Sequence, residues 1–242
     1  MPGSAAQILR TLEALNLFWD GEVTYQSARL EHYRAALEQL RRGGHTFECS
    51  CSRQALSAQG DRGYPGTCRQ GPRAAGPTAT RFRVPEAEWV EFSDRLQGPQ
   101  RQRLGELGDV VIRRRDGLFA YQLAVVVDDA EQNITDIVRG ADLIESTAWQ
   151  IKLQRALGYG MPRYAHLPLV TGADGGKLAK SRHALPAQVS QPAQVLYTAL
   201  LLLQQHPPQA LAGLEPGEVL DWAVSHWNPA ALQGCAAVPA PA

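Results

Sequence analysis

The stretch DGLFAYQLAVVVDD, residues 116–129, begins with a predicted turn and is largely apolar after it, so we expect it to form a buried element. Four elements follow it in order: a strand at 134–138, a helix at 146–157 ended by Gly158, a short buried strand at 166–170, and the loop GGKLAKS at 175–181. This succession of strand, helix, strand and loop is typical of α/β proteins with a parallel sheet. The sequence therefore predicts an α/β fold.

Further helices and strands are predicted on both sides of this region. They are helices at 8–15, with Ser4 as N-cap, and at 30–40, ended by Gly43 and Gly44; strands at 80–84 and 109–112; and helices at 195–205 and 217–227. A glycine- and proline-rich stretch at 60–77 is too irregular for regular structure and predicts an insertion. The Ala/Pro tail after the last helix is expected to fray.

The composition of the chain limits which partners and which cellular location we expect. The 242 residues carry 24 Lys plus Arg and 24 Asp plus Glu, so a nucleic-acid partner would have to bind local patches rather than a basic protein as a whole. No uninterrupted apolar stretch is long enough for a membrane span, and the N-terminal residues do not resemble a secretory signal. We therefore expect a cytoplasmic protein with no membrane partner.

Two lysines, Lys177 and Lys180, lie behind a glycine pair in the loop GGKLAKS. A lysine on a flexible loop can reach a phosphate chain and stabilise the negative charge that develops when pyrophosphate leaves. The alternative is that both are solvated loop lysines, as most surface lysines are.

Three of the four cysteines, Cys49, Cys51 and Cys68, lie in one short segment. In a reducing compartment such a cluster is more often a metal site than a disulfide framework, and zinc favours four tetrahedral ligands rich in sulfur. From spacing alone, Tyr64 and His45 are both candidates for the fourth ligand. The alternative is three buried free thiols without a metal, and Cys235 is expected to be an unpaired bystander.

The loop KLAKS, residues 177–181, resembles the KMSKS signature of class I aminoacyl-tRNA synthetases, with Leu178 in place of methionine and Ala179 in place of serine. The segments before it are similar to the glutamyl branch of that family: DGLFAYQLAVVVDD, ITDIVRGADL at 134–143, a Gln-containing helix ending in ALG at 156–158, and AHLPLV at 165–170. The N-terminal SAAQILRTLEALNLFWDG, residues 4–21, and the cysteine segment agree with this branch as well. The resemblance is closest to its short members, which attach glutamate to queuosine in the anticodon of tRNA(Asp).

The resemblance implies a ligase that activates glutamate with ATP, accompanied by Mg, and transfers the glutamyl group to a tRNA(Asp) hydroxyl. It implies that Lys180 contacts ATP with Lys177 in support, that Tyr121 lines the glutamate pocket, and that Arg139 binds the substrate carboxylate, for which a planar guanidinium is well shaped. Without the family context, Tyr121 would be a core residue and Arg139 a surface ion pair. The resemblance also selects Tyr64 as the fourth ligand of a structural zinc, and a monomer is expected.

The resemblance divides the chain into four expected segments. They are the remaining helices of a first Rossmann half at 1–44, a zinc-binding insertion with connective strands at 45–108, a second Rossmann half with the KMSKS-like loop at 109–186, and a helical C-terminal segment with a frayed tail at 187–242. The expected fold is thus an incomplete class I synthetase Rossmann-type parallel sheet.

The glycine-rich turn with the family's HIGH signature has no counterpart in this sequence, so we expect an N-terminally truncated chain with little activity alone. Two alternatives follow: a fragment of a glutamyl-tRNA synthetase, or an inactive remnant that binds tRNA or a partner through the insertion and residues 113–115. The DNA upstream of Met1 would distinguish them.

Overall fold

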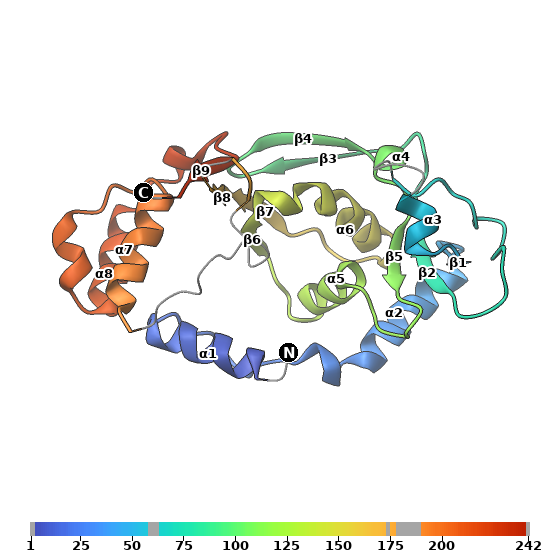
Figure 1. The fold of residues 1–242 in the computed structure, drawn as a ribbon, viewed down its shortest axis with the longest axis horizontal. Coiled ribbons are helices and arrows are strands. Elements are labelled where there is room, and N and C mark those ends of the chain that lie inside the picture. Colours follow the sequence, from blue (N-terminus) through green and yellow to red (C-terminus); the bar gives the residue numbers. More distant parts are fainter. Residues whose placement is uncertain (1–2, 58–62, 173–174, 178–189, 241–242) are drawn as a thin grey trace. The chain divides into compact units, whose positions relative to one another are not determined.

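The computed structural model describes residues 3–57, 63–172, 175–177 and 190–240 of the chain (Figure 1). Its helices are α1 (Ser4–Ala14), α2 (Leu30–Arg42), α3 (Arg53–Ser57), α4 (Leu104–Leu107), α5 (Tyr121–Glu131), α6 (Ile144–Leu157), α7 (Pro192–Leu202) and α8 (Pro216–His226). Its strands are β1 (Thr46–Cys49), β2 (Ala79–Phe82), β3 (Trp89–Asp94), β4 (Gly98–Arg103), β5 (Val110–Arg113), β6 (Asp136–Gly140), β7 (Arg163–Leu167), β8 (Leu169–Thr171) and β9 (Ala237–Pro239).

The chain divides into two compact units. One contains residues 24–95 and 99–165, and the other contains residues 1–23, 96–98 and 166–242. The α/β class is confirmed, but the sheets are mixed rather than purely parallel. In the larger unit, β1, β2 and β5 form an antiparallel three-stranded sheet, and a second sheet has the order β4-β3-β7-β6, in which β3 and β7 run parallel.

The core of the larger unit forms because helices α2, α5 and α6 each place apolar side chains on the sheets and on one another. Helix α5 buries Leu123, Ala124, Val126 and Val127, so the apolar stretch that begins after the turn at 116–117 is a buried helix from Tyr121 onward. Helix α6 ends where Gly158 adopts a left-handed backbone with φ 75°, which glycine tolerates without a Cβ penalty.

Several predicted elements are corrected by the structure. Helix α1 starts at Ser4 itself, and Gly3 occupies the N-cap position. The single strand predicted at 166–170 is two strands, β7 and β8, separated by Pro168, which has no N–H to donate to a ladder. The tail predicted to fray forms β9, which pairs in parallel with β8 through Val170 and Val238.

The smaller unit has a separate helical core. Leu15 after α1 packs with residues of α7 and α8, including Leu196, Leu200 and Val219. Among the described residues, no helix is both long enough and apolar enough to cross a lipid bilayer.

A buried polar network joins α2 to α5 in the larger unit. The carboxylate of Asp128 accepts hydrogen bonds from Arg29 Nε at 2.7 Å, Gln26 Nε2 at 3.0 Å and the Tyr33 hydroxyl at 2.8 Å. Burial, followed by the hydrogen bond to Asp128, raises the pKa of Tyr33 to about 12. The carboxylate is therefore the acceptor for the buried Tyr33 hydroxyl, and it shares the guanidinium of Arg29 with Glu131.

Asp128→Ala should lower the free energy of unfolding by about 2 kcal/mol, because the buried Tyr33 hydroxyl and the Nε of Arg29 lose their acceptor while Arg29 keeps its ion pair to Glu131. Urea denaturation followed by circular dichroism measures this change. The matched control is Glu38→Ala, which removes an exposed ion pair to Arg42 and should cost less than about 1 kcal/mol. Equal losses in the two variants would contradict a supporting role for the network.

Candidate functional site

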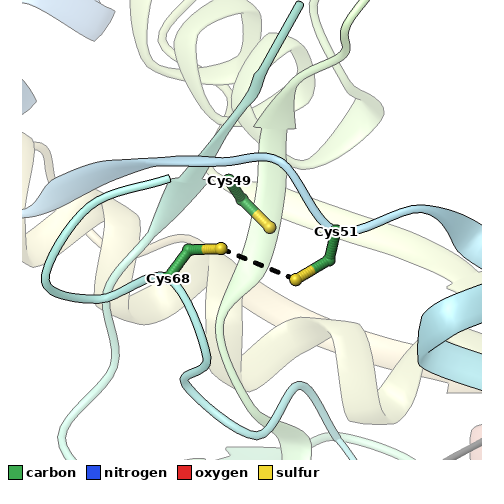
Figure 2. A group of neighbouring side chains, drawn as sticks. All are labelled: Cys49, Cys51 and Cys68. Atoms are coloured by element: carbon green, nitrogen blue, oxygen red, sulfur yellow. Dashed lines mark hydrogen bonds between the residues drawn. The ribbon is translucent and has the colours of Figure 1, made fainter. Parts of the chain in front are cut away.

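The three cysteines predicted to bind a metal come together in the larger unit. Cys49 ends β1, Cys51 follows two residues later, and Cys68 lies in the loop that leads to β2. Their sulfur atoms all lie within 4.8 Å of one another, and Figure 2 shows that they point toward a common centre. The Sγ atoms of Cys51 and Cys68 are 3.6 Å apart.

Tyr64 supplies an oxygen to the same centre. Its hydroxyl lies 3.3 Å from the Sγ of Cys49 and 3.7 Å from the Sγ of Cys51, and it accepts a hydrogen bond from the backbone N–H of Cys68 at 2.8 Å. His45, the other candidate, instead packs against Phe82 with ring centroids 6.2 Å apart. Phe47, Cys49 and Cys68 form the small buried cluster against which Cys51 and Tyr64 pack.

The protonation of this centre is strongly perturbed. Burial acts to raise the pKa of the Cys68 thiol, but hydrogen bonds from the Tyr64 hydroxyl and from backbone N–H groups favour the thiolate and lower the pKa to about 6. Burial raises the pKa of Cys51, and burial together with the neighbouring thiols raises that of Tyr64. The thiol of Cys68 therefore ionises more easily than that of Cys51.

Residues outside the cysteine set also hold the loop in place, and no motif in the sequence marks them. Arg69, next to Cys68, donates from Nε and Nη2 to the fully buried carboxylate of Asp109 at 2.7 and 2.8 Å. The Ser50 hydroxyl accepts the backbone N–H groups of Arg73 and Ala74 at 3.0 and 3.1 Å. A short-range sequence pattern contains no signal for these contacts, because each joins segments more than twenty positions apart.

The residues implied by the resemblance are placed as follows. Tyr121 is the first residue of α5 and is about half exposed, with 48% of its surface accessible. Arg139 lies on β6, donates from Nη2 to Thr147 Oγ1 at 2.8 Å, and has its Cζ 5.5 Å from the ring centroid of Tyr164. Lys177 forms an isolated bridge with Thr171, and Lys180 lies outside the described residues.

The start of α5 is tied to α6 by side-chain amides. Gln122 Nε2 donates to Ser146 Oγ at 3.1 Å, and Gln150 Nε2 donates to Gln122 Oε1 at 2.7 Å. The Thr147 hydroxyl that accepts from Arg139 itself donates to the carbonyl of Leu143 at 3.1 Å. Helix α6 thus orients both the first turn of α5 and the guanidinium of Arg139.

Comparison with known proteins places this arrangement in a family. The family model described as tRNA synthetases class I (E and Q), catalytic domain, matches residues 1–204. The chain belongs to this class I tRNA synthetase family. Two relatives named glutamyl-Q tRNA(Asp) synthetase are each 50% identical to this synthetase: that of Aromatoleum aromaticum, over 94% of this chain and 74% of its own length, and that of Pseudomonas aeruginosa, over 99% and 81%.

Solved structures agree on the fold. A glutamate tRNA ligase from Elizabethkingia meningosepticum superposes with a TM-score of 0.76 at 21% identity, and a glutamate-tRNA synthetase from Elizabethkingia anophelis does so with a TM-score of 0.77 at 21% identity. Each comparison covers all of this synthetase and 58% and 59%, respectively, of those longer chains. The described part of the chain thus shares its fold with these synthetases.

Proposed function

We propose that this synthetase activates glutamate with ATP, releasing pyrophosphate, and transfers the glutamyl group to queuosine in the anticodon of tRNA(Asp). The observation that carries the proposal is the 50% identity, over 99% of the chain, to a glutamyl-Q tRNA(Asp) synthetase. Class I synthetases use ATP, and Mg is its usual companion.

Deleting the gene in its own organism tests this function with the protein as the cell makes it. Nucleosides from purified tRNA(Asp) should then contain unmodified queuosine and no glutamylated form by mass spectrometry. Reintroducing the gene should restore the glutamylated nucleoside. Unchanged levels after deletion would overturn the proposal.

Tyr121 and Arg139 are proposed to bind glutamate, since a phenol and a guanidinium can together satisfy a carboxylate. Their settings support these roles. Tyr121 is accessible at the N-terminal end of an eleven-residue helix, where the helix dipole favours negative charge. Arg139 is oriented by the Thr147 hydroxyl, which reduces the conformational freedom lost when a carboxylate binds.

Arg139→Ala should raise the KM for glutamate about 10- to 100-fold with a smaller effect on kcat, because a carboxylate contact made equally in the ground and transition states is lost. Glutamate-dependent exchange of pyrophosphate into ATP by the protein expressed from its native gene locus, measured over a range of glutamate concentrations, separates the two constants. The control is Arg163→Ala, which removes an exposed ion pair to Asp136 on the neighbouring strand and should leave KM unchanged. An unchanged KM in Arg139→Ala would remove this residue from the glutamate site.

The cysteine centre is proposed to hold one structural zinc through Cys49, Cys51, Tyr64 and Cys68. Tetrahedral zinc with sulfur at about 2.3 Å and oxygen at about 2.0 Å needs sulfur–sulfur edges of roughly 3.8 Å and sulfur–oxygen edges of roughly 3.5 Å. The 3.6 Å between the sulfurs of Cys51 and Cys68, and the 3.3 and 3.7 Å from the Tyr64 hydroxyl to the sulfurs of Cys49 and Cys51, fit those edges. The metal would join β1 to the loop before β2, and the chain's own contacts from Arg69 to Asp109 hold that loop in register.

A further inference from the structure

A cavity of about 450 Å³ lies in the larger unit, beside the cysteine centre. Its floor is one face of the β1-β2-β5 sheet, because Cys49 pairs with Ala79 and Arg81 pairs with Val111, and side chains two apart on β2 point to the same face. Ser52 and Leu56, before and within α3, form part of its wall. Residues 114–116 and Ala120, from the segment between β5 and α5, form the rest.

The lining combines apolar surface with guanidinium groups. Arg81, Arg114 and Arg115 all line the cavity, and within the part of the chain that the structure describes Asp116 is the one carboxylate in its lining. That carboxylate is already engaged in its own turn, since Oδ2 pairs with Arg114 at 2.6 Å and Oδ1 accepts the backbone N–H of Leu118 at 3.2 Å. The cavity therefore favours an anion that also has an apolar or aromatic part.

Arg81 is unusual because it is 92% buried, with a relative accessibility of 8%. Its Cζ lies 3.8 Å from the ring centroid of Tyr64, and its Nη1 donates to the carbonyl of Asp109 at 2.7 Å. Its Nε is buried and has no hydrogen-bond partner in the part of the chain that the structure describes. A planar guanidinium held in this way offers a flat surface on which a second aromatic ring can stack.

The two other arginines lie at the rim. The side chain of Arg114 is 51% exposed, so it can turn toward a phosphate at the mouth of the cavity. Arg115 is exposed as well and donates from Nη2 to the carbonyl of Ser50, which fixes the rim against the cysteine segment. The arrangement thus has a buried planar cation at the floor and a movable cation at the opening.

We propose that this cavity takes one unpaired nucleotide of the RNA substrate, with its base at the floor beside Arg81 and its phosphate at Arg114. A base with a phosphate matches both parts of the lining, and unpaired RNA bases are commonly stacked on guanidinium planes. The opening at exposed residues lets a continuous strand enter and leave. This inference rests on the proposed function for the identity of the substrate, because a free mononucleotide has the same chemistry.

Fluorescence anisotropy with the full chain tests the inference. The probes are a labelled RNA hairpin with an unpaired loop, a fully paired RNA duplex of the same length, and AMP as competitor. Arg114→Ala should weaken hairpin binding about tenfold and reduce the slope of log affinity against log salt by about 0.7, the value for one lost phosphate contact on a single strand. Arg81→Lys keeps the charge but loses the planar face, so it should weaken binding about tenfold with no change in that slope.

Arg34→Ala is the matched control, because Arg34 is 56% exposed and paired with Glu31 on α2 much as Arg114 is paired with Asp116. It should leave hairpin binding unchanged. Zinc content and melting temperature of each variant show whether the fold is intact, and Arg114→Ala alone decides the question if Arg81→Lys does not fold.

Three results would overturn the inference. They are unchanged hairpin binding in Arg114→Ala, equal weakening of hairpin binding and duplex binding by the substitutions, and variants that lose AMP binding but still bind the hairpin. The last result would assign the cavity to a free nucleotide. Hairpins carrying 4-thiouridine in the loop should crosslink to peptides containing residues 79–81 or 111–116. Failure of the proposed function would be seen separately, as unchanged glutamylated queuosine in tRNA(Asp) after gene deletion, a result that does not depend on RNA binding by the purified chain.

Discussion

Lys180→Ala is expected to slow glutamate-dependent exchange of pyrophosphate into ATP by about 100- to 1,000-fold, the loss usually seen when one group that stabilises developing charge is removed. When glutamate attacks the α-phosphate, negative charge accumulates on the departing pyrophosphate, and a lysine ammonium can offset it as a compact point charge. Because this interaction strengthens in the transition state, kcat should fall while the KM for glutamate barely changes.

The comparison with Lys177→Ala makes the test specific. Lys177 precedes Lys180 by three positions in the same loop, and its proposed role is to support it, so its removal should cost less. The variants are introduced at the native gene locus and assayed as purified proteins, with glutamylated queuosine in tRNA(Asp) as the cellular readout. Exchange that is unaltered in Lys180→Ala would make GGKLAKS an ordinary solvated loop.

Helices α2 and α6 of the larger unit could be predicted from the sequence because their signals are local, whereas α5 was predicted only as a buried element. Helix α6 has both helical spacing and a terminal Gly158, and the structure ends the helix at that residue with a left-handed backbone. The apolar run after the turn at 116–117 was recognisable as buried from composition alone, and α5 places Leu123 and Val127 in the core.

Strands whose stability depends on distant partners could not be predicted in the same way. The strand β4 has the sequence GPQRQR, which lacks β-branched and aromatic residues, and it lies at the edge of a sheet that is completed by β7 and β6, much later in the sequence. The strand β9 lies in a tail of alanine and proline. It forms by pairing with β8, which is far from it in the sequence. Local propensity contains no information on such pairings.

The candidate metal site could also be predicted only in part. Three clustered cysteines predict a metal from residue type, but spacing left Tyr64 and His45 open as fourth ligand. The structure brings the Tyr64 hydroxyl to within 3.7 Å of two sulfurs, a contact between loops that only the fold can create. The supporting pair of Arg69 and Asp109 depends equally on tertiary structure.

Purified protein is expected to contain about one zinc per molecule, and Cys68→Ala should abolish it. Metal binding contributes directly to the local folding free energy, at about 10 to 16 kcal/mol in small zinc-bound peptides, so loss of one thiolate should have a large effect. Hydrogen bonds lower the pKa of the Cys68 thiol to about 6, and a thiolate is the form that binds zinc.

Loss of the metal should disorder the loop rather than the whole chain, because the main core of the larger unit is formed by α2, α5, α6 and the sheets and does not include Cys49 or Cys68. Amide hydrogen exchange should therefore accelerate at residues 63–75 in Cys68→Ala while protection in α5 and α6 is retained. Cys235→Ala is the control, since Cys235 lies in the smaller unit, and it should keep the full zinc content. Zinc retained at the original stoichiometry in Cys68→Ala would remove this thiol from the ligand set, and unchanged exchange after complete zinc loss would show that Arg69 and Asp109 alone suffice to hold the loop.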